Sequence, residues 1–370
     1  MRIVAVDVVP YAVPLVAPLA TARGALRCRV GCVVRVRADD GTTGIGDAAP
    51  HPRIGTAGLA ALEAELAPFA RWLVGAQVER CDGLLEAAGR LGGAAAMGVD
   101  TALHDLLARA RGVAVVELLG GARRRVAASA LLGADAVRSA RAACDAGFRV
   151  AKLKASADPY ALAGVVAALR SEVPGLALRL DANGSWDVAT ACAVVRALPR
   201  DGIEWIEQPV TGWDLSGLAQ VRRVAQARGH AIAADEAVTG PTAVRRIAAA
   251  GAADVVVLKL QQLGGLRRAL ASAQAASAAG LRVVVTTGID TSLGTAAALH
   301  LAAAVAALGN GASGVDSPDA GLATTHLLAG DIVREPLAPA PSLTPQGPGL
   351  GVVLDERALL RLAATRAEMA

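Results

Sequence analysis

The 370-residue chain has few aromatic residues, few lysines and no long apolar run. Aromatic residues make up 2% of it and its arginines are scattered, so a surface that stacks nucleic-acid bases is not expected, despite the net charge of +4. Its apolar runs are broken by Gly, Arg or Asp before they reach the roughly 18 to 20 residues that a membrane span needs. We therefore expect neither nucleic acid nor a membrane as a partner.

The N-terminal residues also lack the features of a secretory signal peptide. They alternate like a strand and have no charged start, apolar core or small-residue cleavage site, so we expect a cytoplasmic location. The five cysteines are an odd number, and only Cys28 and Cys32 lie close together in the sequence. Because both fall in a predicted strand, buried free thiols are a better interpretation of this pair than a metal site.

Lysine is rare among the basic residues of this chain. Of the 37 basic residues 34 are arginine, and the three lysines are Lys152, Lys154 and Lys259. In a sequence so biased toward Arg and Ala, a lysine that survives is a candidate for work that arginine cannot do, although chance retention is the alternative for any one of them. Only lysine can lose its proton when burial or neighbouring charges lower its pKa, so only lysine can serve as a base.

From about residue 126, eight short β-type runs alternate with seven amphipathic helix-length segments. A period of about 25 to 30 residues in this alternation predicts a closed parallel barrel. A doubly wound sheet would want a GxGxxG turn leading into a helix, and neither residues 44–55 nor 131–136 supply one. The predicted strands are 126–133, 149–156, 177–183, 203–209, 231–237, 254–260, 282–288 and 312–318.

The predicted fold class is therefore α/β, a (β/α)7β TIM-like barrel at residues 126–320 with an α+β capping domain. Residues 1–125 combine alternating strands, a turn at 39–41 and helices, which is typical of such a separate domain. Within residues 321–370, the proline-rich stretch 335–351 cannot be helical, and the tail 355–370 can. We expect this C-terminal segment to pack back on the capping domain.

Charged residues end five consecutive predicted strands, at the face where barrels of this kind carry their chemistry. The spacing from one strand end to the next is 24 to 28 residues, which is one strand plus one helix. An Asp at a strand end can simply cap the next helix, as expected for Asp187, but the acids of this series do not stand directly before helices. The series consists of Lys152, Lys154, Asp181, Glu207, Asp235 and Lys259.

Three carboxylates that converge on one rim repel one another unless a cation lies between them. Oxygen ligands without His or Cys favour Mg²⁺ or Mn²⁺ over Zn²⁺. Lys152 and Lys154 are two apart on a strand and so face the same way, and their repulsion, together with the metal, should lower the lysine pKa toward working pH. Such a base beside a divalent cation suits the removal of a proton next to a carboxylate, where an enediolate with two negative charges forms.

These residues resemble those of the enolase superfamily, and most closely its muconate-lactonizing subgroup, over nearly the whole chain. By this resemblance Lys154 is the base, Lys152 supports the substrate carboxylate and Lys259 faces Lys154 across the substrate. It also implies that Asp181, Glu207 and Asp235 bind Mg²⁺, that Arg179, Asn183 and Glu236 support them, and that the first domain closes the site. The motifs are LysLeuLys at 152–154, ArgLeuAspAlaAsn at 179–183, GluGlnPro at 207–209, AlaAspGlu at 234–236, and Lys259 with Gly264 and Gly265.

Membership of this subgroup does not fix the reaction, because several activities share its catalytic set. Residues 18–36, 46–59, 286–297 and 321–332 look most like o-succinylbenzoate synthase, a lyase of menaquinone biosynthesis. In that family a hydroxyl-rich turn helps to hold the succinyl carboxylate, and the matching residues here are Thr286, Thr287, Asp290, Thr291 and Ser292. A helix N-cap at Thr291 or Ser292 is the structural alternative, and both roles are compatible.

Some positions depart from that pattern. Asp47 stands where the cap usually has Glu, and Thr286 and Thr287 stand where serines are more common. The paired acids expected of a dipeptide epimerase are imperfect, since Asp316 and Asp319 are three apart. Dipeptide epimerase, N-acylamino acid racemase and muconate cycloisomerase remain the alternative activities, and a barrel that binds a ligand without turnover is a remote one. We expect a small-molecule carboxylate as substrate and a homo-oligomeric assembly.

Overall fold

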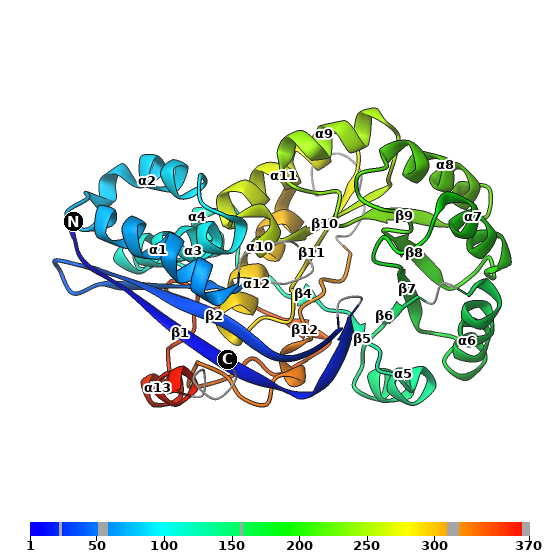
Figure 1. The fold of residues 1–370 in the computed structure, drawn as a ribbon, viewed down its shortest axis with the longest axis horizontal. Coiled ribbons are helices and arrows are strands. Elements are labelled where there is room, and N and C mark those ends of the chain that lie inside the picture. The colour runs from blue at the N-terminus through cyan, green and yellow to red at the C-terminus, as the bar shows by residue number, and fades with distance from the viewer. Residues whose placement is uncertain (22–23, 51–57, 156–157, 309–317, 365–370) are drawn as a thin grey trace.

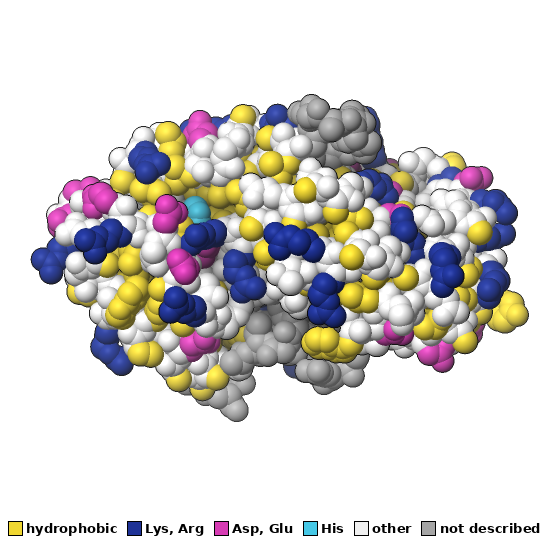
Figure 2. Space-filling view, turned by 90° about the horizontal axis from the view of Figure 1, so that it is seen from above, with side chains coloured by type: hydrophobic (Ala, Val, Ile, Leu, Met, Phe, Trp, Pro, Cys, Tyr) yellow, Lys and Arg dark blue, Asp and Glu magenta, His cyan; other side chains and the backbone are white. Residues whose placement is uncertain are grey.

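The computed structural model describes residues 1–21, 24–50, 58–155, 158–308 and 318–364. Figure 1 shows an antiparallel sheet with helices, formed by the N-terminal part, beside a curved parallel sheet surrounded by helices. The fold is α/β, with a capping sheet separate from the barrel sheet, as predicted. No helix in these ranges is long and apolar enough to cross a bilayer. In the view of Figure 2 the basic side chains are scattered over the surface and form no single patch.

The capping sheet has three antiparallel strands in the order β1 (Ile3–Thr21), β2 (Gly24–Ala38) and β3 (Thr43–Ala48). The predicted turn joins β2 to β3, and Gly41 takes the positive φ of 87° that favours glycine there. Cys28 and Cys32 lie on β2 and form no disulfide; Cys32 is buried, as predicted, whereas Cys28 is only partly buried. The long β1–β2 hairpin reaches across to the barrel, where its far end lies near β5 in Figure 1.

Helices cover one face of the capping sheet. They are α1 (Leu59–Leu73), the 3₁₀ helix η2 (Val78–Arg80), α2 (Cys81–Ala88), α3 (Gly93–Ala110) and α4 (Val115–Leu118). Helix α3 approaches β3 so closely that a Cβ at Gly46 would lie 2.0 Å from the Gly98 carbonyl oxygen. A cluster of buried side chains that includes Val34, Leu62 and Leu103 joins the sheet to these helices.

In the part of the chain that the structure describes, the barrel sheet has seven parallel strands in sequence order, and the helices between them form an outer ring. Central strands such as VVVLK at 255–259 are apolar and buried, as expected where helices and barrel interior cover both faces. The strands are β5 (Ala130–Leu131), β6 (Val150–Lys154), β7 (Ala177–Asp181), β8 (Ile203–Glu207), β9 (Ala231–Ala234), β10 (Val255–Lys259) and β11 (Arg282–Thr286). The helices are α5 (Ala136–Asp145), α6 (Pro159–Glu172), α7 (Val188–Ala197), α8 (Leu215–Gln226), α9 (Pro241–Ala249), α10 (Leu260–Leu263), α11 (Leu266–Ala278) and α12 (Ser292–Leu308).

Aspartates fix where several of these helices begin. Asp187 is the N-cap of α7, and its carboxylate accepts a hydrogen bond from the Thr190 N–H at 2.7 Å, which confirms the predicted capping role. Asp135 and Asp214 cap α5 and α8 in the same way. The acids at the strand ends are therefore a separate set from the acids that cap helices.

Residues 320–321 close the barrel between its first and last strands. Ala320 bridges to Ala128 on one side and Gly321 bridges to Thr286 on the other, both in parallel. The predicted eighth strand was 312–318, of which 312–317 lie outside the described residues. The predicted first strand is also shorter in the barrel than expected, because its start, β4 (Val126–Ala127), pairs instead with β12 (Ser342–Leu343).

The C-terminal segment returns to the N-terminal layer. After the 3₁₀ helix η4 (Thr325–Leu327) and the proline-rich stretch, α13 (Glu356–Ala364) lies beside β1 in Figure 1. Glu356 accepts from the Arg35 guanidinium on β2 at 2.7 Å. The described part of the tail therefore contacts the cap sheet.

Candidate active site

A cavity of about 730 Å³ lies at the C-terminal ends of the barrel strands. Lys152, Lys154 and Lys259 all line it, and residues 17–19 of the cap strand β1 form part of its wall. A second concavity, of about 670 Å³, lies at the opposite end of the barrel around His230 and Arg282 and is lined by no lysine. The three lysines of the chain thus gather at one site.

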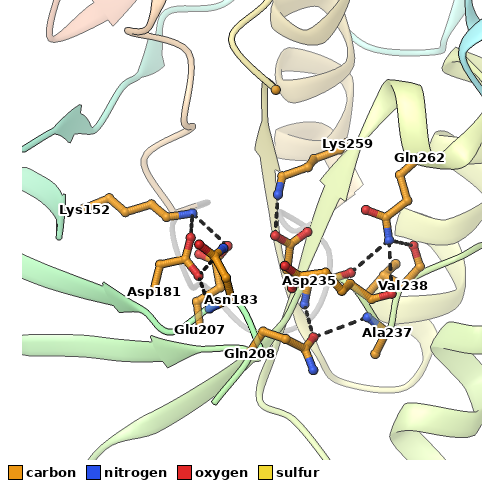
Figure 3. Close-up of polar contacts among 12 residues, drawn as sticks. Lys152, Asp181, Asn183, Glu207, Gln208, Asp235, Ala237, Val238, Lys259 and Gln262 are labelled. Atoms are coloured by element: carbon orange, nitrogen blue, oxygen red, sulfur yellow. Dashed lines mark hydrogen bonds and ion pairs between the residues drawn. The ribbon is translucent and has the colours of Figure 1, made fainter. Parts of the chain in front are cut away.

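Lys152 holds two of the strand-end acids together. Its ammonium group lies 2.6 Å from Asp181 Oδ2 and 2.8 Å from Glu207 Oε1. Asp181, Lys152 and Glu207 come from neighbouring parallel strands, so their side chains converge where those strands end (Figure 3). Each is buried or largely buried, which strengthens the ion pairs relative to pairs in water.

Lys259 makes the matching contact on the other side of the acids. Its ammonium group donates to Asp235 Oδ2, and Asp235 is fully buried. In Figure 3 the Lys152 group and the Lys259 group lie on opposite sides of the site. Lys154 stands two residues after Lys152 at the end of β6, and β6 and β10 are four strands apart in a barrel of seven strands and one closing segment. Lys154 and Lys259 therefore reach the cavity from opposite walls.

Neighbouring carboxylates dominate the electrostatics of two of the lysines. Burial alone would lower the pKa of Lys152, but attraction to Asp181 and Glu207 outweighs it and raises that pKa. The same balance, with Asp235 as the main attracting charge, raises the pKa of Lys259. The predicted fall in pKa concerned Lys152 and Lys154 beside a metal ion, and it stays a prediction. The protein charges alone raise the pKa of Lys152 because its ammonium group packs against carboxylates.

The carboxylates of the site outnumber the lysines. Burial raises the pKa of Glu207 to about 7, and it raises the pKa of Asp235 and Glu236 as well. Four acids at this end of the barrel face three lysines, the acids being Asp181, Glu207, Asp235 and Glu236. Asp235 Oδ1 and Glu236 Oε2 are buried without a hydrogen-bond partner in the described structure.

These features test whether the residues suit a divalent cation. Among the described residues no three acidic, His or Cys side chains form a ready-made metal cluster. The ammonium groups of Lys152 and Lys259 offset part of the repulsion between the acids. The donor set fits a hard cation such as Mg²⁺, because it is all carboxylate oxygen and one buried oxygen of Asp235 has no hydrogen-bond partner among the described residues.

The predicted supporting residues have different surroundings. Asn183 donates through Nδ2 to Asp181 Oδ1 at 2.8 Å and so orients that carboxylate. Glu236 lines the cavity. Arg179 is 2% exposed, lies 3.9 Å over the Trp205 ring and donates to Glu204 at 2.7 Å. Arg179 therefore fills the barrel interior below the acids as well as contributing to the cavity wall.

Two glutamines that the sequence argument did not single out hold the Asp235 segment. Gln208 Oε1 accepts from the backbone N–H groups of Asp235 and Ala237, at 2.9 and 3.3 Å. Gln262 Nε2 donates to three carbonyl oxygens of the same turn, those of Asp235, Glu236 and Val238 (Figure 3). The GluGlnPro motif contained Gln208, but only the fold shows which backbone groups it binds.

The hydroxyl-rich turn after β11 divides into two parts. Thr286 and Thr287 line the cavity, and Thr286 Oγ1 is buried without a partner in the described structure. Asp290, Thr291 and Ser292 do not line it. Asp290 accepts a hydrogen bond from the Arg29 guanidinium. The hydroxyl groups of Thr291 and Ser292 donate hydrogen bonds to Asp47 and Asp331, respectively. Of the dipeptide-epimerase acids, Asp316 lies outside the described residues.

Two family matches together cover most of the chain. Residues 3–120 match the mandelate racemase / muconate lactonizing enzyme N-terminal domain, and residues 135–358 match the enolase C-terminal domain-like family. Muconate cycloisomerase 1 of Rhodococcus opacus is 32% identical over 377 residues, which is 96% of each chain. The o-succinylbenzoate synthase of Thermobifida fusca is 39% identical over 212 residues, 56% of this chain and 62% of that protein.

Solved structures agree with the sequence matches. A dipeptide epimerase from Enterococcus faecalis, complexed with Mg and the dipeptide L-Leu-L-Tyr, is 27% identical with a TM-score of 0.86, over 95% of this chain and 99% of that one. A muconate lactonizing enzyme from Pseudomonas fluorescens, complexed with muconolactone, is 26% identical with a TM-score of 0.87, over 98% and 99%. These relatives are enzymes that bind small molecules.

Proposed function

Because this chain belongs to the mandelate racemase / muconate lactonizing enzyme family of the enolase superfamily, we propose that it removes a proton next to a substrate carboxylate. The observation that carries this proposal is the placement of Lys154 and Lys259 on opposite walls of one cavity, above a floor of buried acids. A carbon acid held between two such lysines can lose its proton to one and be stabilised by the charge of the other.

Asp181, Glu207 and Asp235 are proposed to hold Mg²⁺, with Mn²⁺ as a substitute. When bound there, the cation would supply positive charge that stabilises the negative charge developing on the substrate carboxylate. Lys152 keeps Asp181 and Glu207 in place through its two ion pairs. Gln208 and Gln262 hold the backbone of the Asp235 turn, so the acid set is fixed before substrate binds.

We propose o-succinylbenzoate synthase as the specific activity, a dehydration that yields an aromatic product. Lys154 would take the ring proton beside the carboxylate, and the electrons of that C–H bond would form the enediolate. As the C–O bond to the ring hydroxyl breaks, the Lys154 ammonium group would return the proton to the departing oxygen, and water leaves. Lys259 would act as a fixed cation over the intermediate.

The cavity is compatible with this substrate. Its wall is largely apolar, through side chains such as Leu19, Leu131 and Val165, and Thr286 and Thr287 offer hydroxyl groups for a distal carboxylate. The 39% identity with the Thermobifida fusca synthase supports the same choice. This identity applies to the matched region, which is 56% of this chain and 62% of the synthase.

Muconate cycloisomerase is the second candidate, since relatives with that activity match this chain over nearly its full length. Dipeptide epimerase is a third, favoured by the structural similarity to the Enterococcus faecalis enzyme. An epimerase needs both Lys154 and Lys259 as bases, one on each face of the substrate, because inversion returns the proton from the side opposite to its removal. The synthase and the epimerase therefore assign different roles to Lys259.

The test is turnover of each substrate class with Mg²⁺ present. Given the cyclohexadiene carboxylate precursor, the enzyme should form o-succinylbenzoate with a kcat/KM of about 10⁴ M⁻¹s⁻¹ or more. Muconate should be turned over far more slowly, and dipeptides or N-succinyl amino acids in D₂O should exchange their α-proton far more slowly. Efficient lactonization of muconate, or efficient dipeptide exchange, with no aromatic product from the precursor would refute the synthase assignment.

A further inference from the structure

Three non-glycine residues of the described chain have a positive φ, and each follows a barrel strand at the active-site end. They are Asn183 at 49°, Gln208 at 38° and Ile289 at 66°. Asparagine tolerates this left-handed region, but a β-branched side chain is the least suited to it. Ile289 therefore adopts a backbone conformation that its β-branched side chain disfavours, so contacts with the rest of the protein must impose that conformation.

Ile289 is also part of the cavity wall. Its side chain is 7% exposed, and it lies with Gly288 and Thr287 among the residues that line the cavity beyond the end of β11. The next residues in the chain, Asp290 and Thr291, do not line the cavity. The left-handed turn thus directs Ile289 to the cavity and the following two side chains to the cap.

A buried ion pair holds this turn from the cap side. Arg29 on β2 is 2% exposed, and its Nη2 donates to Asp290 Oδ1 at 3.1 Å and to the Ala49 carbonyl oxygen at 2.6 Å. Its Nη1 donates to the Pro50 carbonyl oxygen. Asp290 Oδ1 also accepts from Gln261 Nε2, and Gln261 lines the cavity two residues after Lys259. Arg29 therefore connects the cap to two elements of the cavity wall.

A second buried contact fixes the residue after Asp290. Thr291 Oγ1 donates to Asp47 Oδ2 at 2.8 Å, and Asp47 Oδ1 accepts from the Tyr11 hydroxyl at 2.6 Å. Glycines leave room for these groups, since a Cβ at Gly294 would lie 2.9 Å from Asp47 Oδ2 and one at Gly31 would lie 2.5 Å from the Tyr11 hydroxyl oxygen. Side chains of the cap thus bind both residues that follow Ile289, namely Asp290 and Thr291.

We propose that Ile289 is a specificity-determining residue, held against the substrate by the buried contacts of Arg29 with Asp290 and of Asp47 with Thr291. The substrate class it selects is a carboxylate whose body presents an apolar face to the end of β11. The inference rests on the proposed function, which anchors the substrate carboxylate among the lysines and acids. The apolar part of the substrate then lies toward the remaining walls of the cavity. Arg29, Asp290, Asp47 and Thr291 are positioning residues, since they act through the turn.

The test of Ile289 combines kinetics with stability. Ile289→Ala and Ile289→Gly should raise KM for the wild-type enzyme's best substrate by roughly tenfold or more and leave kcat within about twofold, because they remove apolar contact made equally in the ground and transition states. The glycine variant should also have a Tm at or above that of the alanine variant, because glycine relieves the strained φ.

Ile247 provides the matched control, as a fully buried isoleucine in helix α9 that does not line the cavity. Ile247→Ala should lower Tm without changing KM, and Ile247→Gly should lower Tm further, since glycine is the poorer helix former. Position 289 should therefore reverse the order of alanine and glycine seen at position 247. An unchanged KM in both Ile289 variants, or the same Tm order at both positions, would overturn the proposal.

A mutant cycle tests whether the cap acts through Ile289. Asp290→Asn should raise KM in the wild-type background and have little further effect in the Ile289→Gly background. If Asp290→Asn does not fold, Thr291→Val serves in the same cycle and keeps both buried charges. Fully additive effects would refute the positioning role. Failure of the synthase proposal is distinguishable, because it appears in the wild-type enzyme as a different best substrate, whereas these comparisons use whichever substrate is turned over.

Discussion

Lys152→Met should destabilise the protein strongly in the absence of a divalent cation. The change removes the ammonium group that lies 2.6 Å from Asp181 and 2.8 Å from Glu207, and it leaves both carboxylates buried without that partner. At an effective dielectric near 20, each contact is worth about 6 kcal/mol before desolvation is counted. Because desolvation offsets much of this, we expect a net loss of about 3 to 5 kcal/mol in the free energy of unfolding.

Thermal unfolding followed by circular dichroism measures this loss. For 370 residues, with an unfolding entropy of about 2.1 cal/mol/K per residue, the loss corresponds to a fall in Tm of about 4 to 6 °C. The measurement is made once in chelator and once in excess Mg²⁺. If the acids bind the cation, Mg²⁺ should recover a larger share of Tm in Lys152→Met than in wild type, because it replaces the missing charge.

Two companion variants make the result specific. Lys152→Arg keeps the charge and should lose less stability than Lys152→Met. Adding Glu207→Gln to Lys152→Met removes one of the stranded charges and should restore part of the loss. A Tm for Lys152→Met equal to that of wild type in chelator, or a Glu207→Gln change that is simply additive, would show that the ion pairs do not hold the acids together.

Three further predictions concern the base, the metal and the cap. Lys154→Arg should fold and bind Mg²⁺ yet lose at least about 10³-fold in kcat, because a guanidinium cannot accept the proton, and near-normal turnover would remove Lys154 as the base. Chelation should abolish activity and Mg²⁺ or Mn²⁺ restore it, while Asp235→Asn should weaken Mg²⁺ binding in calorimetry with an unchanged circular dichroism spectrum; full activity in chelator would contradict this. Burial, with repulsion from Asp290, raises the pKa of Asp47 from 3.8 to about 6, so the folded protein holds that proton more tightly than the unfolded chain and loses stability as pH rises through this range. Relative to wild type, Asp47→Asn should therefore gain up to about 3 kcal/mol in unfolding free energy between about pH 4 and pH 7, and a pH-independent difference would refute the assignment.

Much of the fold could be predicted because it depends on local periodicity. The alternation of apolar strands with amphipathic helices predicted the parallel barrel, and the spacing of Lys154, Asp181, Glu207, Asp235 and Lys259 placed each at a strand end. The end of the barrel was less predictable. The bridges of Ala320 and Gly321 depend on which distant backbone groups remain unpaired, and that is decided only when the sheet closes.

The chemistry of the site depends on contacts that no local pattern contains. The sequence identified the three lysines but did not show that carboxylates surround Lys152 and Lys259 and raise their pKa, because a pKa depends on which charges lie within a few ångströms after folding. It also grouped Asp290, Thr291 and Ser292 with the substrate-binding residues. In the folded protein the backbone turn at Ile289 directs these three side chains away from the cavity.

By itself the sequence therefore determined the barrel, the cap, the family and the set of charged residues at the strand ends, because each of these is written in the order and spacing of residues along the chain. The tertiary structure alone decided the partner of each charge. Arg29 and Asp290 are 261 positions apart, and only the docking of the cap on the barrel brings them to 3.1 Å. The buried pair then holds the turn at Ile289, which lies between Asp290 and the cavity. No property of residues 286–292 considered alone could fix the conformation of that turn.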